Sequence, residues 1–459
     1  MPLEITEDLI ARQPPEAQAI IRILLAKIAE LEARLNKTPQ NSSLPPSTQH
    51  PHAKPTPTRT KSKKNRGGQP GHPQHERALI PVEDCEELIT LKPQQCRRCG
   101  TKLTGADPQP LRHQVWELPE IKPIVTEYQQ HRLTCPCCGK TTCAPLPAGV
   151  PSGQSGPRLI AFVALLMAYF RQSKRRTSLF VTSILNTPCC PALTVKHQHL
   201  ATQALRPGYE ELVRALPSQP QLHGDESPTK EAQQKSWLWT FVARQFTVFA
   251  LRPSRAATVL TELLGENFQG VMCCDRAKMY WQCGHLQWCW AHLKRDFQAL
   301  VDDPDPQVKR LGRDLMQPTK ALFRHWSRCR DGTLTRRGLK HVLRPIRREV
   351  EALLLRGHGT AAHGMCRELY DHRQWLWTFV EAEGVQPTNN TAERSLRQAV
   401  IWRKLSFGTQ SAPGSRFVET LLSVIETCRQ QHRSVFEFVT QAVQAHFHGQ
   451  QPPSPLPGA

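Results

Sequence analysis

Residues 221–251 read QLHGDESPTKEAQQKSWLWTFVARQFTVFAL, and this stretch decides the fold. It opens with a short apolar run that ends at a carboxylate, Asp225. Two β-rich runs follow, Trp237 to Val242 and Phe246 to Leu251, and the three residues between them predict a hairpin. The sequence therefore predicts three consecutive strands, with an acid at the end of the first.

Downstream of this stretch the pattern alternates between helix and strand. Residues 256–264 have helical spacing, and residues 270–275 predict a buried strand that also ends at an aspartate, Asp275. Residues 286–290 are a candidate fifth strand that leads into a helix carrying His292. This order of elements predicts an α/β ribonuclease-H-like catalytic core.

The two aspartates are candidates for a metal site. Because each follows a strand, adjacent strands would place the two side chains close together. Two such carboxylates repel, and each raises the pKa of the other unless cations lie between them. Two Mg²⁺ or Mn²⁺ ions about 4 Å apart are the usual solution in phosphoryl transfer, one activating the attacking oxygen and the other stabilising the leaving oxygen. A third carboxylate from a helix would complete this site.

Glu393, in the segment Asn389 to Arg394, is the candidate for that third carboxylate. The same spacing also fits a capping box, in which Glu393 would serve the N-terminus of its own helix. Cations crowd the segment, and because they suit phosphates they favour a substrate groove over a cap. These cations are Arg394, Arg397, Arg403, Lys404 and Arg416.

Two cysteine pairs upstream, each with two residues between its cysteines, predict a structural zinc site. A pair makes a tight turn whose two sulfurs point at one ion, and Gly100 and Gly139 follow the pairs as turn residues. Cys137 and Cys143 are left over. The predicted zinc ligands are Cys96, Cys99, Cys135 and Cys138.

The first 74 residues predict a helix and an arm. Leucine and isoleucine recur at intervals of three and four between Ala19 and Leu35, which is an a/d seam of about two heptads. This helix either pairs with its copy in another protomer or docks on its own chain. From Lys37 to Gln74, Pro, Ser, Thr and Gln dominate, which predicts a flexible basic arm or a plain linker. Its cations include Lys61, Lys63, Lys64 and Arg66.

Two helical regions flank the predicted core. Residues 157–216, with Arg175 and Arg176 near the start of the second helix, fit either a helix-turn-helix DNA reader or a small helical bundle. Residues 302–385 predict a helical insertion whose many arginines either contact DNA or form an ordinary solvated face. After Glu393 we expect two amphipathic helices under the sheet and a disordered tail from Gly449.

The formal net charge of +21 over 459 residues suits a polyanionic partner, nucleic acid first and an anionic membrane surface second. The longest apolar stretch, residues 159–170, is too short to span a bilayer, and no secretory signal opens the sequence. We therefore expect a cytoplasmic, nucleoid-associated protein. The predicted domains are a coiled-coil helix (1–36), a disordered basic linker (37–82), a zinc ribbon (83–150), a helical DNA-binding module (151–216), the core in two parts (217–300 and 386–448) around a basic insertion (301–385), and a disordered tail (449–459).

Together these segments resemble the transposases of the bacterial insertion sequence 66 family. The resemblance runs almost the whole length and rests on the order of several short motifs. It implies a DDE transposase with the acidic triad Asp225, Asp275 and Glu393. Such an enzyme would cut one DNA strand to expose a 3′ hydroxyl at an element's terminal repeats and join that hydroxyl to target DNA. It also implies accessory proteins of the same element, and we expect a homo-oligomer. The motifs are Asn41 to Ser47, Gly67 to His72, the cysteine pairs, His223 to Ser227, Asp275 to Ala277, Cys289 to His292 and Asn389 to Arg394.

The sequence departs from the family pattern in places. Ser227 stands where the family usually has threonine, and two cations follow Asp275 in place of a small-residue turn. Cys289 and His292 would need two more ligands for a second metal site, with Cys283 and His285 as candidates; packing or substrate contact is the alternative. The rival function is a catalytically inactive DNA-binding regulator derived from a transposase.

Overall fold

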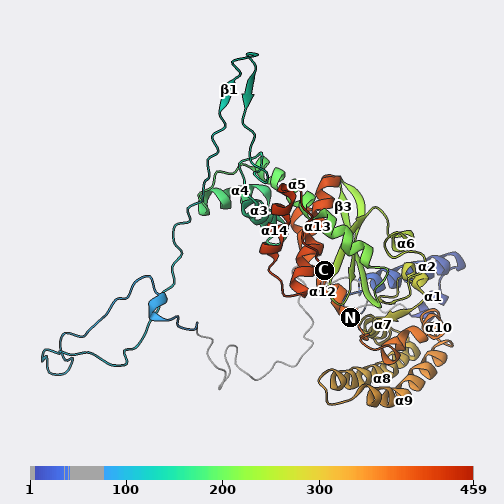
Figure 1. Cartoon of the computed structure of the whole chain (residues 1–459). Coiled ribbons are helices and arrows are strands. Elements are labelled where there is room, and N and C mark those ends of the chain that lie inside the picture. The colour runs from blue at the N-terminus through green and yellow to red at the C-terminus, as the bar shows by residue number, and fades with distance from the viewer. Residues whose placement is uncertain (1–5, 36, 40, 42–76, 458–459) are drawn as a thin grey trace. The chain divides into compact units, whose positions relative to one another are not determined.

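The computed structural model describes residues 6–35, 37–39, 41 and 77–457 (Figure 1). The chain divides into two compact units, Pro51–Lys122 and the remainder, and each is described by itself. The cations predicted for the basic arm, Lys61, Lys63, Lys64 and Arg66, lie outside the described residues. No helix in the described ranges is long and apolar enough to cross a membrane.

A five-stranded mixed sheet forms the centre of the larger unit, in the order β5-β4-β3-β6-β7. Antiparallel pairing joins β3, β4 and β5, and parallel pairing joins β3 to β6 and β6 to β7. All five predicted strands are present. Positive φ angles at Ala232 and Gln233 make the tight turn between the first two. The strands are β3 (Gln221–Glu231), β4 (Gln234–Val242), β5 (Thr247–Arg252), β6 (Val271–Cys274) and β7 (Leu286–Trp288).

Helices cover both faces of this sheet (Figure 1). Alternate residues of a strand point to opposite faces, so Trp239 and Phe241 of β4 lie in one core cluster while Leu238 lies in the other. Burial on both faces explains why these strands read as nearly continuous apolar runs. The first cluster includes α6 (Thr258–Leu264), α7 (Trp290–Val301), α8 (Pro306–Arg330), α9 (Arg336–Gly357), α10 (His363–Asp371) and α11 (Gln374–Glu381); the second includes α3 (Pro157–Ala168), α4 (Lys174–Ile184), α5 (Pro191–Ala215), α12 (Asn390–Ser406), α13 (Ala412–Gln430) and α14 (Val435–Phe447).

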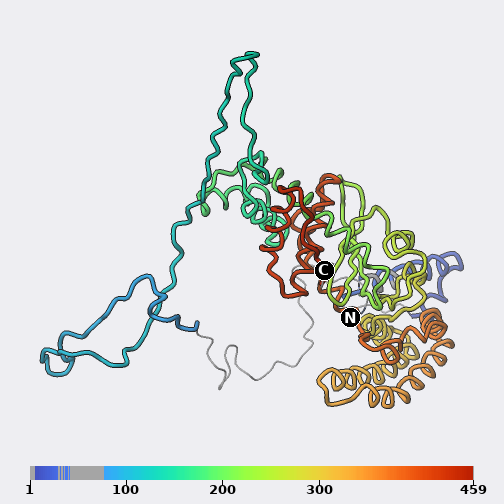
Figure 2. Tube along the Cα trace, viewed as in Figure 1, coloured from blue at the N-terminus to red at the C-terminus, as the bar shows by residue number. Residues whose placement is uncertain are grey.

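The helical region predicted as a DNA-binding module shares a core with the end of the chain. Helix α5 packs against α13 and α14, and α3 packs against α14. Figure 2 shows these late helices lying among the earlier ones, although nearly 200 residues or more of sequence separate them. Arg175 and Arg176 of α4 remain exposed on this assembly.

Helix α13 covers the free edge of β5. The backbone N–H groups of Thr247, Phe249 and Leu251 donate to side chains of α13 four residues apart, at 2.8–3.1 Å. Four residues advance a helix by about 6 Å and two residues advance a strand by about 6.6 Å, so the two series stay in step. An edge strand otherwise offers its unpaired groups to other chains. The acceptors on α13 are Glu419, Ser423 and Thr427.

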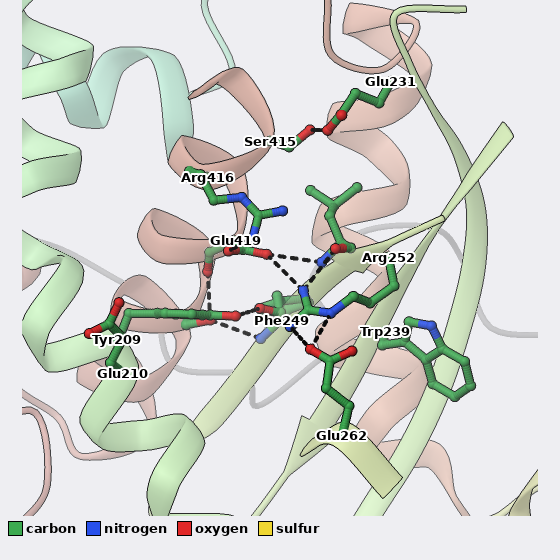
Figure 3. Close-up of polar contacts among 12 residues, drawn as sticks. Tyr209, Glu210, Glu231, Trp239, Phe249, Arg252, Glu262, Ser415, Arg416 and Glu419 are labelled. Carbon is green, nitrogen blue, oxygen red and sulfur yellow. Dashed lines mark hydrogen bonds and ion pairs between the residues drawn. The ribbon is translucent and has the colours of Figure 1, made fainter. Parts of the chain in front are cut away.

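Glu419 also sits at the centre of a buried ionic cluster (Figure 3). Its side chain is fully buried and lies 2.7 Å from Arg206, 2.8 Å from Arg416 and 3.6 Å from Arg252. Arg252 in turn pairs with Glu262 of α6. Because Arg416 pairs with Glu419, this arginine belongs to the ion-pair cluster at α13 and does not surround Glu393 as the sequence suggested.

The insertion between the second and third acids is helical, as predicted. Helices α8 and α9 pack side by side, and α11 packs against β7 (Figure 1). Most of their leucines are buried, although Leu355 is exposed, and most of the arginines lie on the outer face. Several of the cations bond within the chain: Arg356 pairs with Asp314, Lys340 with Glu381, and Arg336 donates to backbone carbonyls. The remaining exposed cations include Arg310, Arg313, Arg324, Arg328, Arg337, Arg344 and Arg348.

Two terminal segments differ in how they are placed. In α2 (Pro15–Leu35), Leu24, Ile28, Leu31 and Leu35 of the predicted seam are exposed, so the stripe does not dock on the described part of its own chain. The tail predicted to be disordered instead packs against α5. Its Ser454 donates to Glu211 at 2.7 Å, and Pro455 is buried, because this segment finds hydrogen-bond partners that its composition did not reveal.

Candidate active site

The two aspartates lie on neighbouring parallel strands. The last paired residues are His223 of β3 and Cys273 of β6, and Asp225 and Asp275 each follow two residues later. Asp275 lies just beyond β6, as predicted. The prediction that β3 ends at Asp225 is wrong, because β3 continues to Glu231 through its hairpin pairing with β4.

The residues around the aspartates hold them in defined orientations. Asp225 accepts a hydrogen bond from the backbone N–H of Glu226, and Asp275 accepts one from Ala277, both at 2.9 Å. Gly224 leaves room for Tyr280, since a Cβ at this position would lie 3.0 Å from the tyrosine ring and 2.9 Å from the sulfur of a neighbouring methionine. A larger residue would therefore push the strand away from the ring.

Glu226 is not a free member of this acidic group. Its carboxylate accepts a hydrogen bond of 2.6 Å from the Tyr280 hydroxyl and one of 2.7 Å from Arg255. Burial first, and then the charge of Asp275, raise the pKa of Glu226, while the tyrosine and the arginine act in the opposite direction. These two partners hold Glu226, whereas no cation in the described part of the chain is hydrogen-bonded to Asp225 or Asp275.

Asn389 fixes the start of α12 to β3. Its amide donates to the carbonyl of Gly224 at 2.7 Å, and its side-chain oxygen lies 3.2 Å from Nδ1 of His223. Burial lowers the pKa of His223 to about 4, so the ring is neutral. Gln221 donates to Nε2 of this ring, which leaves Nδ1–H to donate to Asn389. Helix α12 therefore begins at a fixed point beside Asp225.

Glu393 lies in the first turn of α12 and does not cap it. The N-terminal cap residue, Asn389, makes no side-chain capping bond, and Oε1 of Glu393 has no hydrogen-bond partner among the described residues. The carboxylate lies 3.6 Å from Nδ1 of His292 and 3.9 Å from the guanidinium group of Arg295. The capping-box interpretation is therefore not supported.

The three predicted acids interact electrostatically. Asp225 is half-buried, and desolvation raises its pKa well above the usual value, with further increases from the charges of Glu226, Asp275 and Glu393. The acids are nevertheless not packed into one tight cluster. In the described part of the chain, three ligand atoms lie within 4.8 Å of one another only at Cys289, His292 and Glu393.

The cations near the acids have different roles. Arg276, next to Asp275, turns to Asp296 and Glu368, at 3.0 and 2.9 Å. Arg403 donates to Ser227 at 2.9 Å and to the carbonyl of Pro228, which ties the end of α12 to β3. Arg394, Arg397 and Lys404 are exposed on α12.

The two cysteine pairs form turns of the same kind. In one, Gly100 donates to the carbonyl of Cys96 and Cys96 donates to Thr101; in the other, Gly139 donates to Cys135 and Cys135 donates to Lys140, all at 2.9 Å. The second turn joins β1 (Arg132–Thr134) to β2 (Thr141–Cys143). The Thr101 hydroxyl lowers the pKa of Cys99, and the backbone N–H of Cys138 lowers that of Cys135. The pairs fall in different compact units, so each turn is described alone.

Sequence reasoning missed several residues that build the site. It named Asn389 only as part of a motif, and it gave no role to His223, Arg255 or Tyr280. Sequence spacing gave no signal that Glu393 would meet Cys289 and His292. The candidates proposed to complete that cysteine and histidine pair, Cys283 and His285, do not belong to the group.

Comparison with known families identifies the class of protein to which the chain belongs. Residues 93–139, which contain the four predicted zinc ligands, match the zinc-finger binding domain of transposase IS66, and residues 152–416 match the transposase IS66 family. The protein is thus a transposase with a zinc-finger domain that holds structural zinc. The second match spans more than half of the 459 residues, so the chain belongs to the IS66 transposase family and the predicted family is confirmed. Residues 6–78 match a family of unknown function, and no curated protein matches the chain.

Proposed function

We propose that this protein is a DDE transposase that cleaves DNA at the ends of its element and joins the released 3′ hydroxyl to target DNA. The observation that supports the proposal is that Asp225 and Asp275 each follow by two residues the last pair of neighbouring parallel strands, with the charge of Glu393 acting on Asp225, in a chain of this family. Sheet order adds support: three antiparallel strands extended by two parallel ones is the arrangement of a ribonuclease-H-like core.

The residues present fit a pair of divalent ions. Asp225 is half-buried beside other acids, and among the described residues no cation is hydrogen-bonded to it; an uncompensated charge away from water is costly. Carboxylate oxygens suit Mg²⁺ and Mn²⁺. Held by Asp225, Asp275 and Glu393, these ions would supply the electrostatic stabilisation that phosphoryl transfer requires.

The protein's own residues would bind and orient the DNA around this site. Asn389 ties the start of α12, which carries Glu393, to Gly224 beside Asp225, and Arg403 ties the other end of that helix to β3. Exposed cations would contact phosphates, which positions DNA without reading its sequence. We propose this role for Arg175, Arg176, Arg394, Arg397 and Lys404, for the basic face of the insertion, and for Lys61, Lys63, Lys64 and Arg66 of the arm.

We assign the structural zinc to Cys96, Cys99, Cys135 and Cys138. The matching turns and the lowered pKa values of Cys99 and Cys135 support this assignment, since zinc binds the thiolate. The exposed seam of α2 supports self-association through a short coiled coil, because an unpartnered apolar stripe is stabilised by burial against a second copy.

The full-length protein tests the main proposal when it is incubated with Mg²⁺ or Mn²⁺ and duplexes carrying the repeats that flank its own gene. We expect strand cleavage at the repeat ends, and none with Glu393→Gln. Binding should weaken steeply with salt, because phosphate contacts release counterions. Specific binding without cleavage under either metal ion would favour the inactive regulator.

Asn389→Ala should slow cleavage by about tenfold to a hundredfold, because a small displacement of Glu393 is costly. The variant also leaves His223 and the Gly224 carbonyl without a partner, so we expect the free energy of unfolding to fall by about 1–3 kcal/mol. The measurements are single-turnover cleavage and urea unfolding. Asn390→Ala, at the exposed neighbouring residue, is the matched control and should change neither. Wild-type cleavage by Asn389→Ala would show that Asn389 does not position Glu393.

A further inference from the structure

A cysteine, a histidine and a glutamate meet beside the acidic site. Cys289 is the N-terminal cap residue of α7, and His292 lies in the first turn of that helix. Glu393 reaches them from α12, and the three ligand atoms lie within 4.8 Å of one another. The two helix starts are held together by hydrogen bonds from Trp290 to the carbonyl of Pro387 and from the Asn389 N–H to the sulfur of Cys289.

Two polar atoms in this group face each other without a bond. Nδ1 of His292 and Oε1 of Glu393 are both buried, and neither has a hydrogen-bond partner among the described residues. Their separation of 3.6 Å is too long for a hydrogen bond, which needs about 2.7–3.2 Å. It is close to the roughly 3.4 Å between two ligand atoms that share a tetrahedral zinc ion, given bonds of about 2.0–2.2 Å.

The chemistry of the three side chains selects the kind of ion. A thiol and an imidazole suit zinc and similar transition metals, whereas Mg²⁺ takes oxygen ligands. Three protein ligands leave a fourth tetrahedral position open, as in zinc sites that bind water or substrate. The Asn389 N–H that bonds to Cys289 would be an outer contact that holds the sulfur in place.

We propose that Cys289, His292 and Glu393 form a transition-metal site for Zn²⁺ or Co²⁺, separate from the zinc finger. Binding there engages Glu393, the residue assigned above to the divalent pair with Asp225 and Asp275. Zinc therefore competes with the Mg²⁺ form of the enzyme and inhibits DNA cleavage. The metal-binding part of this inference stands without the proposed function, and the inhibitory part rests on it.

Zinc content of the full-length protein tests the binding part. After weakly bound metal is removed and the protein is dialysed against Zn²⁺, we expect His292→Ala and Cys289→Ser each to hold one zinc ion per chain fewer than wild type. Cys366→Ser, a buried cysteine of α10 outside the group, is the matched control and should hold the wild-type number. Equal zinc content in wild type and both site variants would overturn the proposal.

A second measurement separates this ion from the zinc finger. In a chain carrying Cys96→Ser and Cys99→Ser, Co²⁺ should still give a thiolate charge-transfer band, and adding Cys289→Ser should remove it. Thermal unfolding of each variant shows whether it is folded, and His292→Gln gives a more conservative replacement if His292→Ala is not. A cobalt band that survives Cys289→Ser would also overturn the proposal.

The inhibitory part is tested by adding Zn²⁺ to cleavage reactions in Mg²⁺. Zinc should lower the cleavage rate of wild type by a factor of at least about ten, which corresponds to about 1.4 kcal/mol. The rate of Cys289→Ser should fall much less, relative to its own rate without zinc. Equal inhibition of both proteins would contradict the shared role of Glu393. If neither protein cleaves DNA, the proposed function fails, while the zinc content still decides whether the metal site exists.

Discussion

Asp225→Asn is expected to lower the rate of metal-dependent DNA cleavage by about a thousandfold or more while leaving DNA binding nearly unchanged. The stabilisation that metal ions supply in such reactions is several kcal/mol, and each 1.36 kcal/mol is a factor of about ten in rate. Asparagine has nearly the same shape but carries no charge to hold the ions. Single-turnover cleavage and a binding titration on the same duplex measure the two quantities.

The same substitution should stabilise the metal-free protein. Burial and the neighbouring acids raise the pKa of Asp225, so the folded chain keeps a proton that the unfolded chain has already released. The contribution of Asp225 to the free energy of unfolding is therefore lost as the pH rises from the usual carboxyl pKa towards the raised pKa of the folded chain. In EDTA near neutral pH, Asp225→Asn should have a higher Tm than wild type and a shallower fall of Tm with pH.

Added Mg²⁺ completes this comparison. Ions that bind only the folded state raise its Tm, so wild type should gain stability with Mg²⁺ and Asp225→Asn should gain less. Asp371→Asn, at an exposed carboxylate of the insertion, is the control and should behave like wild type in every assay. Near-normal cleavage by Asp225→Asn, together with an unchanged response of its Tm to Mg²⁺, would remove Asp225 from the site.

The second large effect concerns Glu419. Glu419→Ala should lower the free energy of unfolding by about 3 kcal/mol, because it removes a fully buried carboxylate that three partly buried arginines share. The variant also removes the acceptor for the backbone N–H of Leu251 at the edge of the sheet. Urea unfolding followed by circular dichroism measures the loss.

A surface glutamate supplies the comparison. Glu437 pairs with Arg158 at 3.3 Å, and both side chains are more than half exposed. Glu437→Ala should therefore cost less than about 1 kcal/mol. Similar losses for the two variants would mean that the Glu419 cluster contributes no more than an ordinary surface pair.

Local pattern in the sequence was enough to predict the strands and to place two acids on neighbouring ones. Alternation, apolar runs and turn residues act within a few positions, and β6 ends before Asp275 as they indicated. The length of β3 was missed because its second half is defined by pairing with β4. The role of Asn389 was missed because its partners, His223 and Gly224, lie more than 160 residues earlier. The zinc-finger match confirms the class of domain that the cysteine pairs predicted.

The packing of α3 and α5 against α13 and α14 has a consequence for how the protein is made. A ribosome adds about 5–20 residues per second, so roughly 10–50 s pass between the translation of α3 and that of α13. During this time the apolar side of α3 has no partner from α13 or α14. Glu393 also emerges late, after the whole insertion. A nascent chain would therefore need protection from aggregation during this interval, and it gains its third acid only after the whole insertion has been translated.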